Sequence, residues 1–257
     1  MLDNKKIVVT GAASGIGAKT VELLKQQGAT VIGLDIVPAA NVDEFIQLDL
    51  TSKSSIDAAI DKLEGIDGLC NVAGLPPTQD KIKVMTVNLV ALRYLTEGAI
   101  AKMNNGGSIV NVASLAGIGW PNSVDAIKDS LANMNFNNIE AYCEKHEIVG
   151  PQSYFFSKEA LLVWTMLNRW TWRERGIRMN CVSPGPVNTP ILKDFIETLG
   201  ERAEEDMKVM DRTGTPEDIA PVISFLLSDA SAWLRGINIP VDGGMSSHVM
   251  EKMHDLA

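Results

Sequence analysis

The sequence predicts an α/β fold in which one doubly wound parallel sheet carries helices on both faces. Short apolar runs rich in β-branched residues recur along the chain, and longer segments with apolar residues at helical spacing separate them. Strands that alternate with helices in this way form parallel sheets whose two faces are both covered. The predicted strands are residues 7–9, 30–34, 68–72, 108–112, 177–182 and 237–241.

The helical segments carry their own signals. Residues 56–63 place apolar side chains one helical turn apart. Thr215, Pro216 and Asp218 supply an N-cap, a proline at the first helical position and an early acid, which predict a helix over the apolar run 222–227. Because no repeat, low-complexity tract or Pro/Ser-rich linker divides the chain, we expect a single domain over residues 1–257.

The composition is that of an ordinary globular protein and argues against two classes of partner. The chain has 257 residues, of which 46% are hydrophobic and 21% charged, so it can fill one large core. A net charge of −9 without a Lys/Arg cluster disfavours nucleic acid. No apolar run approaches the roughly 18 residues of a transmembrane helix, so no membrane partner is expected.

Neither the cysteines nor the histidines form a recognisable motif. Cys70, Cys143 and Cys181 make no C-x-x-C pair, which suits a reducing cytoplasm. The histidines lack metal-ligand spacing and lie among polar residues, so we expect surface positions and no metal site. They are His146, His248 and His254.

A glycine-rich loop follows the first predicted strand and leads into a helix expected to begin near Ala18. Its pattern, G-x-x-x-G-x-G, lets the backbone turn tightly and approach a pyrophosphate, whose charge the helix N-terminus then meets. The alternative is a strand-to-helix turn without a ligand. The loop supplies five candidate cofactor-binding residues, Gly11, Ser14, Gly15, Ile16 and Gly17.

Asp35 ends the second strand about 20 residues beyond this loop, where a carboxylate can accept hydrogen bonds from the adenosine ribose. It also repels a 2′-phosphate, and neither Ala12, Ala13 nor Ile36 offers the cation that such a phosphate needs. The sequence therefore predicts a Rossmann fold that binds NAD rather than NADP. The alternative for Asp35 is a solvated acid at a strand end.

Three residues suggest acid–base chemistry. Ser114 follows a predicted strand, and Tyr154 and Lys158 lie four residues apart, on one face of an apolar helical segment. A nearby ammonium favours the ionised form of a phenol, so Tyr154 could exchange the proton of a substrate while Ser114 holds the same oxygen. Taken alone, Tyr-x-x-x-Lys is common by chance and is better explained by a structural pair of side chains on one helix.

The order of these motifs resembles the short-chain dehydrogenase/reductase family over almost the whole chain. Further matching runs are Asn71-Val72-Ala73-Gly74, Pro184 to Thr189 and Val241 to Gly244, although Val72 replaces a common Asn. The resemblance implies that Asn88 completes a proton relay through Lys158 and a water, and that Lys158 and Tyr154 also contact the cofactor. It implies further cofactor contacts from Asp49 and Leu50 beside the adenine, Asn71, Ala73 and Gly74 along the cofactor, and Pro184, Val187 and Thr189 at the nicotinamide.

The chain departs from the family pattern between Ser114 and Tyr154, which are 40 positions apart, much farther than is usual. We therefore expect an insertion at residues 119–150. Four apolar residues in it recur at helical spacing, which predicts an amphipathic helix. They are Val124, Ile127, Leu131 and Met134.

This arrangement is similar to a bacterial branch of the family that acts on coniferyl-type aromatic alcohols and 3α-hydroxysteroids. The expected function is NAD-dependent hydride transfer between nicotinamide and a hydrophobic alcohol or carbonyl compound, with an aromatic alcohol as first choice and a 3-hydroxysteroid as second. Two other classes stay open. A catalytically inactive NAD-binding regulator would not need Ser114, Tyr154 and Lys158 together, and an epimerase or dehydratase would need a larger region after Thr189.

Several large apolar residues are candidates for the substrate site or for subunit contacts. Trp120 lies near Ser114 in sequence and could line a pocket for an aromatic substrate. The segment after Thr189 could form a mobile apolar lid, with Phe195, Leu199, Met207 and Met210 on it. Core or subunit contacts are expected for Trp164, Trp170 and Trp172, assigned to the Tyr154 helix.

The insertion also bears on assembly. In most members of the family the helix that carries the catalytic Tyr packs against its copy in a neighbouring subunit. An insertion just before that helix would cover this surface. We therefore expect a homodimer formed elsewhere, for example through residues 237–241, although a tetramer stays possible.

Overall fold

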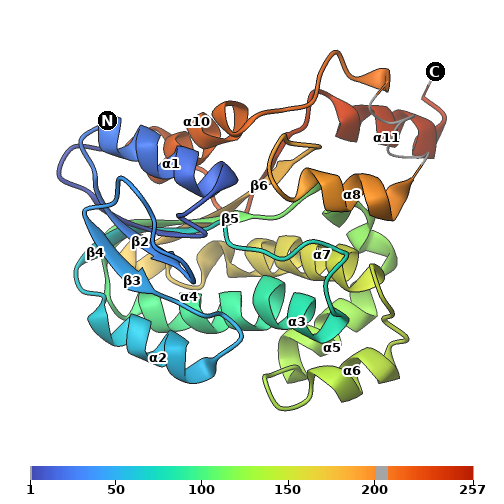
Figure 1. Cartoon of the computed structure of the whole chain (residues 1–257), viewed down its shortest axis with the longest axis horizontal. Coiled ribbons are helices and arrows are strands. Elements are labelled where there is room, and N and C mark those ends of the chain that lie inside the picture. Colours follow the sequence, from blue (N-terminus) through green and yellow to red (C-terminus); the bar gives the residue numbers. More distant parts are fainter. Residues whose placement is uncertain (1, 201–207, 257) are drawn as a thin grey trace.

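The computed structural model describes residues 2–200 and 208–256 and contains one seven-stranded parallel sheet. The strand order is β3-β2-β1-β4-β5-β6-β7, in which the chain first builds outward from β1 and then crosses over to β4 (Figure 1). This is the doubly wound arrangement that the sequence predicts. The strands are β1 (Lys6–Thr10), β2 (Thr30–Asp35), β3 (Glu44–Gln47), β4 (Ile66–Asn71), β5 (Met103–Val112), β6 (Arg178–Pro184) and β7 (Asn238–Val241).

Helices cover both faces of the sheet, and each face has its own core. Helices α1 (Gly15–Gln26) and α10 (Pro216–Leu227) lie on one face. The opposite face carries α2 (Lys53–Lys62), α4 (Leu92–Ile100) and α7 (Gln152–Leu167) (Figure 1). Alternation along β1 divides its side chains between the cores, because Val8 packs with α2 and α4 while Ile7 and Val9 pack with α1 and α10.

Two element boundaries differ from the expectation. Helix α1 begins at Gly15 rather than near Ala18, because the Ala18 N–H already donates to the Ser14 carbonyl. The first turn of the helix therefore contains two glycines, Gly15 and Gly17. The six apolar runs predicted as strands do not include β3, because Ile46 is the one fully buried side chain of this strand. An edge strand of four residues offers too little apolar sequence to be recognised.

The helix predicted from Thr215 is present as α10. The Asp218 carboxylate accepts a hydrogen bond from the Thr215 N–H at 2.7 Å and pairs with Arg212 at the same distance. These contacts hold the start of α10 in the way that its N-terminal sequence indicates.

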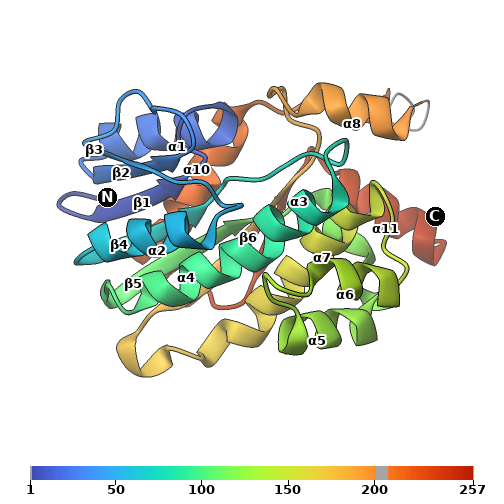
Figure 2. The same ribbon diagram turned by 60° about the horizontal axis from the view of Figure 1, so that its bottom comes forward.

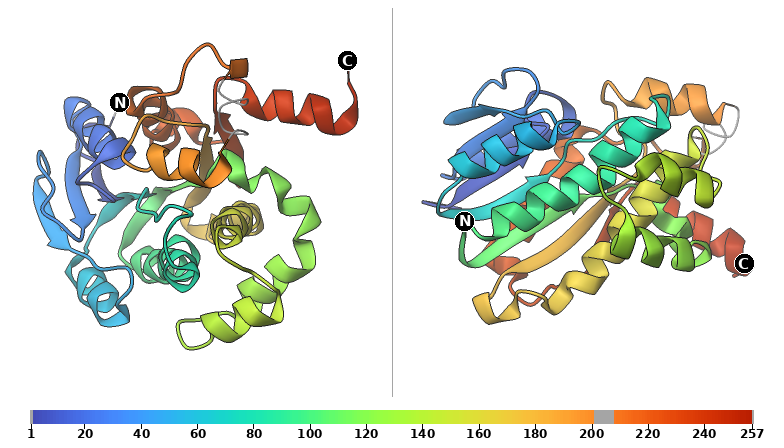
Figure 3. Two further views of the ribbon diagram at one scale, coloured as in Figure 1. Left: turned by 45° about the vertical axis from the view of Figure 1, so that its right-hand side comes forward. Right: turned by 90° about the horizontal axis from the view of Figure 1, so that it is seen from below.

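The segment 119–150 folds over its own subunit. After a 3₁₀ segment, η2 (Leu115–Asn122), it forms helices α5 (Val124–Asn133) and α6 (Ile139–Lys145). The predicted helix is thus confirmed, and its Ile127 and Met134 are buried in a third core with Phe156 and Ala160 of α7. Figure 3 (left) looks almost along α7 and shows the segment curving around that helix.

Polar contacts hold α5 to the end of α6 and to α4. Asp129 of α5 pairs with Lys145 at 2.8 Å and with the His146 ring at 2.6 Å, while Arg93 of α4 donates to the Leu131 carbonyl. His146 is therefore not a free surface residue: its side chain is 20% exposed and stacks on Tyr142. His248 is partly exposed although its Nε2 atom is buried, and His254 is exposed.

Three consecutive helical segments form one continuous helix that runs beside α7 (Figure 2). It consists of α3 (Lys81–Met85), the π-helical turn η1 (Thr86–Ala91) and α4. A π turn inside a helix shifts the side chains that follow it and often marks a functional position. Here the turn contains Asn88.

The remaining elements lie at the carboxyl ends of the strands or after α7. Helices α8 (Leu192–Leu199) and α11 (Met245–His254) lie at the carboxyl ends of the strands. Short turns are η3 (Asn168–Trp170), η4 (Arg173–Arg175) and η5 (Asp229–Ser231). Assigning all three tryptophans to the Tyr154 helix is wrong, because α7 ends at Leu167: Trp164 is buried in the core, Trp172 is partly buried against it, and Trp170 is 58% exposed. Across residues 2–200 and 208–256, no helix has both the length and the apolar character needed to cross a bilayer.

Candidate active site

The glycine loop between β1 and α1 is shaped by close backbone contacts. A Cβ on Gly17 would lie 1.9 Å from the Gly11 carbonyl oxygen, and one on Gly11 would lie 2.9 Å from Ala73. Gly11 also has a φ of +69°, which favours glycine. Ser14 occupies the N-cap position of α1 without a side-chain capping bond. The helix therefore presents its N-terminal amides to any anion in the loop.

Asp35 ties this loop to the end of β2. One carboxylate oxygen accepts from the Ala13 N–H at 3.0 Å and the other from the Val37 N–H at 3.3 Å. The side chain is thus oriented at the edge of the loop and partly exposed. This position suits recognition of a ribose by a fixed acceptor.

A cleft runs across the carboxyl ends of β1, β2 and β4, at the point where the strand order reverses. We call it the cofactor cavity. Such switch points are where doubly wound sheets bind their ligands. Most of the predicted cofactor residues line it: Gly11, Ser14, Gly15, Ile16, Gly17, Asp35, Asp49, Leu50, Ala73, Gly74 and Thr189.

Asn71 lies apart from this group. Its side chain turns into the core, where the amide donates to Thr96 at 2.9 Å and to Asn111 at 2.8 Å. Val72 contributes to the cavity wall instead. The family motif thus lies at the strand end that borders the cavity, but the Asn71 side chain forms hydrogen bonds within the core and does not point into the cavity.

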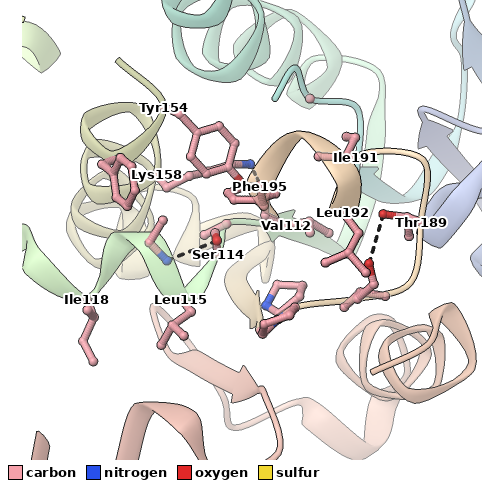
Figure 4. A pocket seen from close by; sticks show the side chains of 18 of the residues that line it. Val112, Ser114, Leu115, Ile118, Tyr154, Lys158, Thr189, Ile191, Leu192 and Phe195 are labelled. Carbon is pink, nitrogen blue, oxygen red and sulfur yellow. Dashed lines mark hydrogen bonds between the residues drawn. The ribbon is translucent and has the colours of Figure 1, made fainter. Parts of the chain in front are cut away.

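A second cavity, of about 450 Å³, adjoins the first and contains the candidate acid–base residues. We call it the catalytic cavity. Ser114 enters from the end of β5, while Tyr154 and Lys158 enter from one face of α7, and Figure 4 shows the three side chains turned toward one another. Pro184, the last residue of β6, and Val187, which follows the strand, line the same cavity.

The protonation of the two α7 residues is governed by burial. Burial raises the pKa of Tyr154 to about 12, against a smaller lowering by a hydrogen bond with Ser114. Burial lowers the pKa of Lys158 to about 8. The expectation that the Lys158 ammonium lowers the pKa of the Tyr154 phenol is not met here, because its Nζ donates to the Val112 carbonyl at 2.9 Å and lies 5.5 Å from the ring centroid.

Asn88 is fully buried in the π turn. Its amide clamps the backbone of Leu75, accepting from the N–H at 2.7 Å and donating to the carbonyl at 3.0 Å. Gly74 lies between Asn88 and Lys158: a Cβ there would be 3.4 Å from the Asn88 Oδ1 and 3.7 Å from the Lys158 Nζ. The structure therefore brings Asn88 close to Lys158.

The other walls of the catalytic cavity are apolar. They come from η2, α7, α8 and α11, and include Leu115, Ile118, Phe155, Leu192, Met245 and Val249. Trp120 is not among the described lining residues and packs against the core instead. None of these positions was predicted from the sequence, although Leu192 lies in the segment after Thr189, Phe155 adjoins Tyr154 and Met245 follows the Val241 to Gly244 motif.

The predicted lid is partly described. Phe195 of α8 lines the catalytic cavity and meets the Tyr154 ring edge-on at 4.9 Å between centroids. Met210 lies near Gly243. Met207 and the side chain of Leu199 lie outside the described residues. Within the described part of the chain, no His, Cys, Asp and Glu side chains gather as metal ligands would.

Comparison with known proteins identifies the family. A family model described as short chain dehydrogenase matches residues 5–124, and one described as Enoyl-(Acyl carrier protein) reductase matches residues 132–246. Coniferyl-alcohol dehydrogenase from Pseudomonas sp. is 45% identical over 250 residues, which cover 96% of this chain and 98% of the relative. The chain belongs to the short-chain dehydrogenase/reductase family. It is therefore an oxidoreductase of a family that uses a nicotinamide cofactor.

Two steroid enzymes of this dehydrogenase/reductase type are more distant. The 3-alpha-hydroxysteroid dehydrogenase/carbonyl reductase of Comamonas testosteroni is 29% identical and covers 94% of this chain and 96% of its own length. The crystal structure of the 3-alpha-hydroxysteroid dehydrogenase from Pseudomonas sp., complexed with NADH, has a TM-score of 0.83 at 29% identity, over 96% of this chain and 99% of that chain.

Proposed function

We propose that this protein is an NAD-dependent alcohol dehydrogenase that acts on a coniferyl-type aromatic alcohol. The observation that carries the proposal is the meeting of Ser114, Tyr154 and Lys158 in an apolar cavity that adjoins the cofactor cavity. An apolar cavity with few convergent polar groups suits a hydrophobic alcohol. The 45% identity with coniferyl-alcohol dehydrogenase favours an aromatic one.

The residues of the cofactor cavity fit a dinucleotide. Gly11 and Gly17 let the loop backbone pack where a Cβ would clash with Ala73 or with the Gly11 carbonyl, and the uncapped start of α1 faces the same loop. Asp49 and Leu50 lie where the adenine would rest, with Thr189 and Val187 toward the nicotinamide. NAD is preferred in this proposal because the Asp35 carboxylate accepts from a ribose hydroxyl and repels a 2′-phosphate.

The chain's own residues handle the proton. In oxidation, the substrate hydroxyl gives its proton to Tyr154 as its carbon gives up a hydride, which leaves a carbonyl compound. Bound nicotinamide supplies the acceptor of that hydride. Ser114 holds the substrate oxygen, and a protonated Lys158 favours the ionised Tyr154 once its Nζ is drawn toward the phenol. Asn88, close to Lys158, is placed to pass the proton onward through water.

A 3α-hydroxysteroid dehydrogenase is the second candidate. The TM-score of 0.83 with the NADH-bound steroid enzyme and the apolar cavity walls favour it. The two candidates share their cofactor and proton chemistry and differ in the shape of the alcohol.

A substrate panel tests the proposal. The purified protein is mixed with NAD and, separately, coniferyl alcohol, other aromatic alcohols and 3α-hydroxysteroids, and NADH is followed by its absorbance. We expect the highest kcat/KM with an aromatic alcohol. A preference for steroids would favour the second candidate. If none of the alcohols gives NADH, the result would point to a regulator that binds NAD without catalysis, or to an epimerase that recycles its hydride.

A further inference from the structure

One carboxylate stands in the otherwise apolar wall of the catalytic cavity. Among the described residues that line this cavity, the charged side chains are Lys158 and Glu159. Lys158 takes part in the proposed proton chemistry, whereas Glu159 has no part in it. Acids are seldom placed in apolar walls without a partner, because removing a charge from water is costly.

Glu159 and the neighbouring Gly119 line the catalytic cavity but are not among the described residues that line the cofactor cavity. A Cβ on Gly119 would stand 2.7 Å from the Glu159 Oε1, so the carboxylate rests against the backbone of η2 at that residue. Gly119 follows Ile118, which Figure 4 shows beyond Leu115, on the opposite side of Ser114 from Thr189. Glu159 is also five positions after Tyr154 on α7, which corresponds to about 7.5 Å along the helix axis.

The carboxylate keeps acceptor capacity for a ligand. Glu159 is half-buried, and burial raises its pKa while a hydrogen bond from Ser123 acts in the opposite direction. Ser123 occupies the N-cap position of α5 but makes no capping bond there, so its hydroxyl is free to hold the carboxylate. An ionised carboxylate offers about four acceptor sites, so one donor leaves most of them unfilled.

We propose that Glu159 is a specificity-determining residue that accepts a hydrogen bond from a hydroxyl group at the end of the substrate opposite the reacting carbon. The inference rests on the proposed function, since the phenol of a coniferyl-type alcohol is such a group. The apolar side chains between the two ends, Leu115 and Phe155 among them, hold the flat ring. A cavity with an acceptor at each end disfavours an alcohol that lacks the distal hydroxyl, because the half-buried carboxylate then gains no hydrogen bond from the substrate.

The test compares two alcohols that differ in that hydroxyl alone, 4-hydroxycinnamyl alcohol and cinnamyl alcohol, with NAD as cofactor. The measured quantity is the ratio of their kcat/KM values. We expect wild type to favour the hydroxylated alcohol and Glu159→Leu to lower the ratio about 10- to 100-fold, the worth of one hydrogen bond to a charged group. Glu159→Gln, which keeps an acceptor without the charge, should fall between them.

Two further variants separate recognition from folding. Gly119→Ala places a methyl group against the carboxylate and should lower the same ratio by displacing it. Glu174→Gln changes an acid whose side chain is 88% exposed and should leave both rates as in wild type. Thermal unfolding of each variant shows whether stability is affected.

The outcomes distinguish this inference from the proposed function. If wild type oxidises both alcohols with equal efficiency, the proposed function stands and the role of Glu159 is wrong. If Glu159→Leu slows both alcohols equally, so that the ratio is kept, Glu159 has a structural role and the inference fails. If wild type oxidises neither alcohol, the proposed function fails together with the inference.

Discussion

The two adjoining cavities are built in different ways. Backbone and small side chains at the ends of β1, β2 and β4 form much of the cofactor cavity, and its tightest points are glycines. Large side chains from η2, α7, α8 and α11, elements outside the sheet, form most of the catalytic cavity. A cavity made from the sheet is determined by the fold, whereas one made from surrounding helices can change its walls while the sheet stays the same.

The largest effect is expected in the catalytic cavity, at Tyr154. Tyr154→Phe removes the hydroxyl that carries the proton and leaves the cofactor cavity intact. Turnover should fall by about 10²- to 10⁴-fold, the usual contribution of general acid–base catalysis. NADH binding, measured by fluorescence titration, should change little. A variant that keeps more than half of the wild-type rate would refute the assigned role of Tyr154.

Lys158 lines the catalytic cavity and should make stability depend on pH. Its pKa is about 8 in the folded protein, whereas an unfolded lysine titrates near 10.4. Between these values the unfolded chain binds more protons, so wild-type stability should rise with pH relative to Lys158→Met, by up to ~3 kcal/mol between pH 8 and 10.5. Urea unfolding at several pH values measures this difference.

Lys62→Met serves as the matched control, because Lys62 is an exposed lysine on α2. Its stability relative to wild type should be constant over the same pH range. If Lys158→Met behaves in the same way, Lys158 is not the buried amine with a lowered pKa described above.

Asp35→Ala should affect the cofactor cavity alone. Loss of a hydrogen bond to a charged group should lower kcat/KM for NAD by about 10- to 100-fold, while removal of the negative charge improves use of NADP. Steady-state kinetics with both cofactors measure the change. Asp61→Ala, an exposed acid on α2, is the control and should leave the cofactor preference unchanged. Equal use of NAD and NADP by wild type would contradict the role of Asp35.

The smallest effect concerns the surface next to the catalytic cavity. Because α5 packs on α7 within one subunit, we expect a dimer joined elsewhere. Strand β7 is a sheet edge, and near it Trp233 is 95% exposed and Ile237 43% exposed. Light scattering should give the mass of two chains, and crosslinking should locate the contact near β7. A tetramer with α7 helices crosslinked between subunits would contradict this model.

The difference between the cavities also explains how far the sequence could predict them. Phosphate-binding turns need glycine at particular backbone positions, so Gly11 and Gly17 are visible as a local pattern, and Tyr154 and Lys158 are visible through helical spacing. The walls made by Phe155, Met245 and Val249 depend on how distant helices pack, which no short pattern encodes. The same reason applies to Asn71, whose motif gives the strand end but not the direction of the side chain, and to Glu159.

The amide contact between Asn71 and Asn111 has a consequence for assembly of the sheet. The two residues face each other in the register of β4 and β5, and the 2.8 Å bond between them is fully buried. A slip of two residues would keep apolar side chains on the same faces of both strands, so the hydrophobic pattern alone tolerates it. It would, however, leave buried amides unpaired, at about 1–3 kcal/mol for each group. The pair thus fixes the register of β4 against β5, and with it the relative positions of Val72 and Ser114 beyond the ends of these strands.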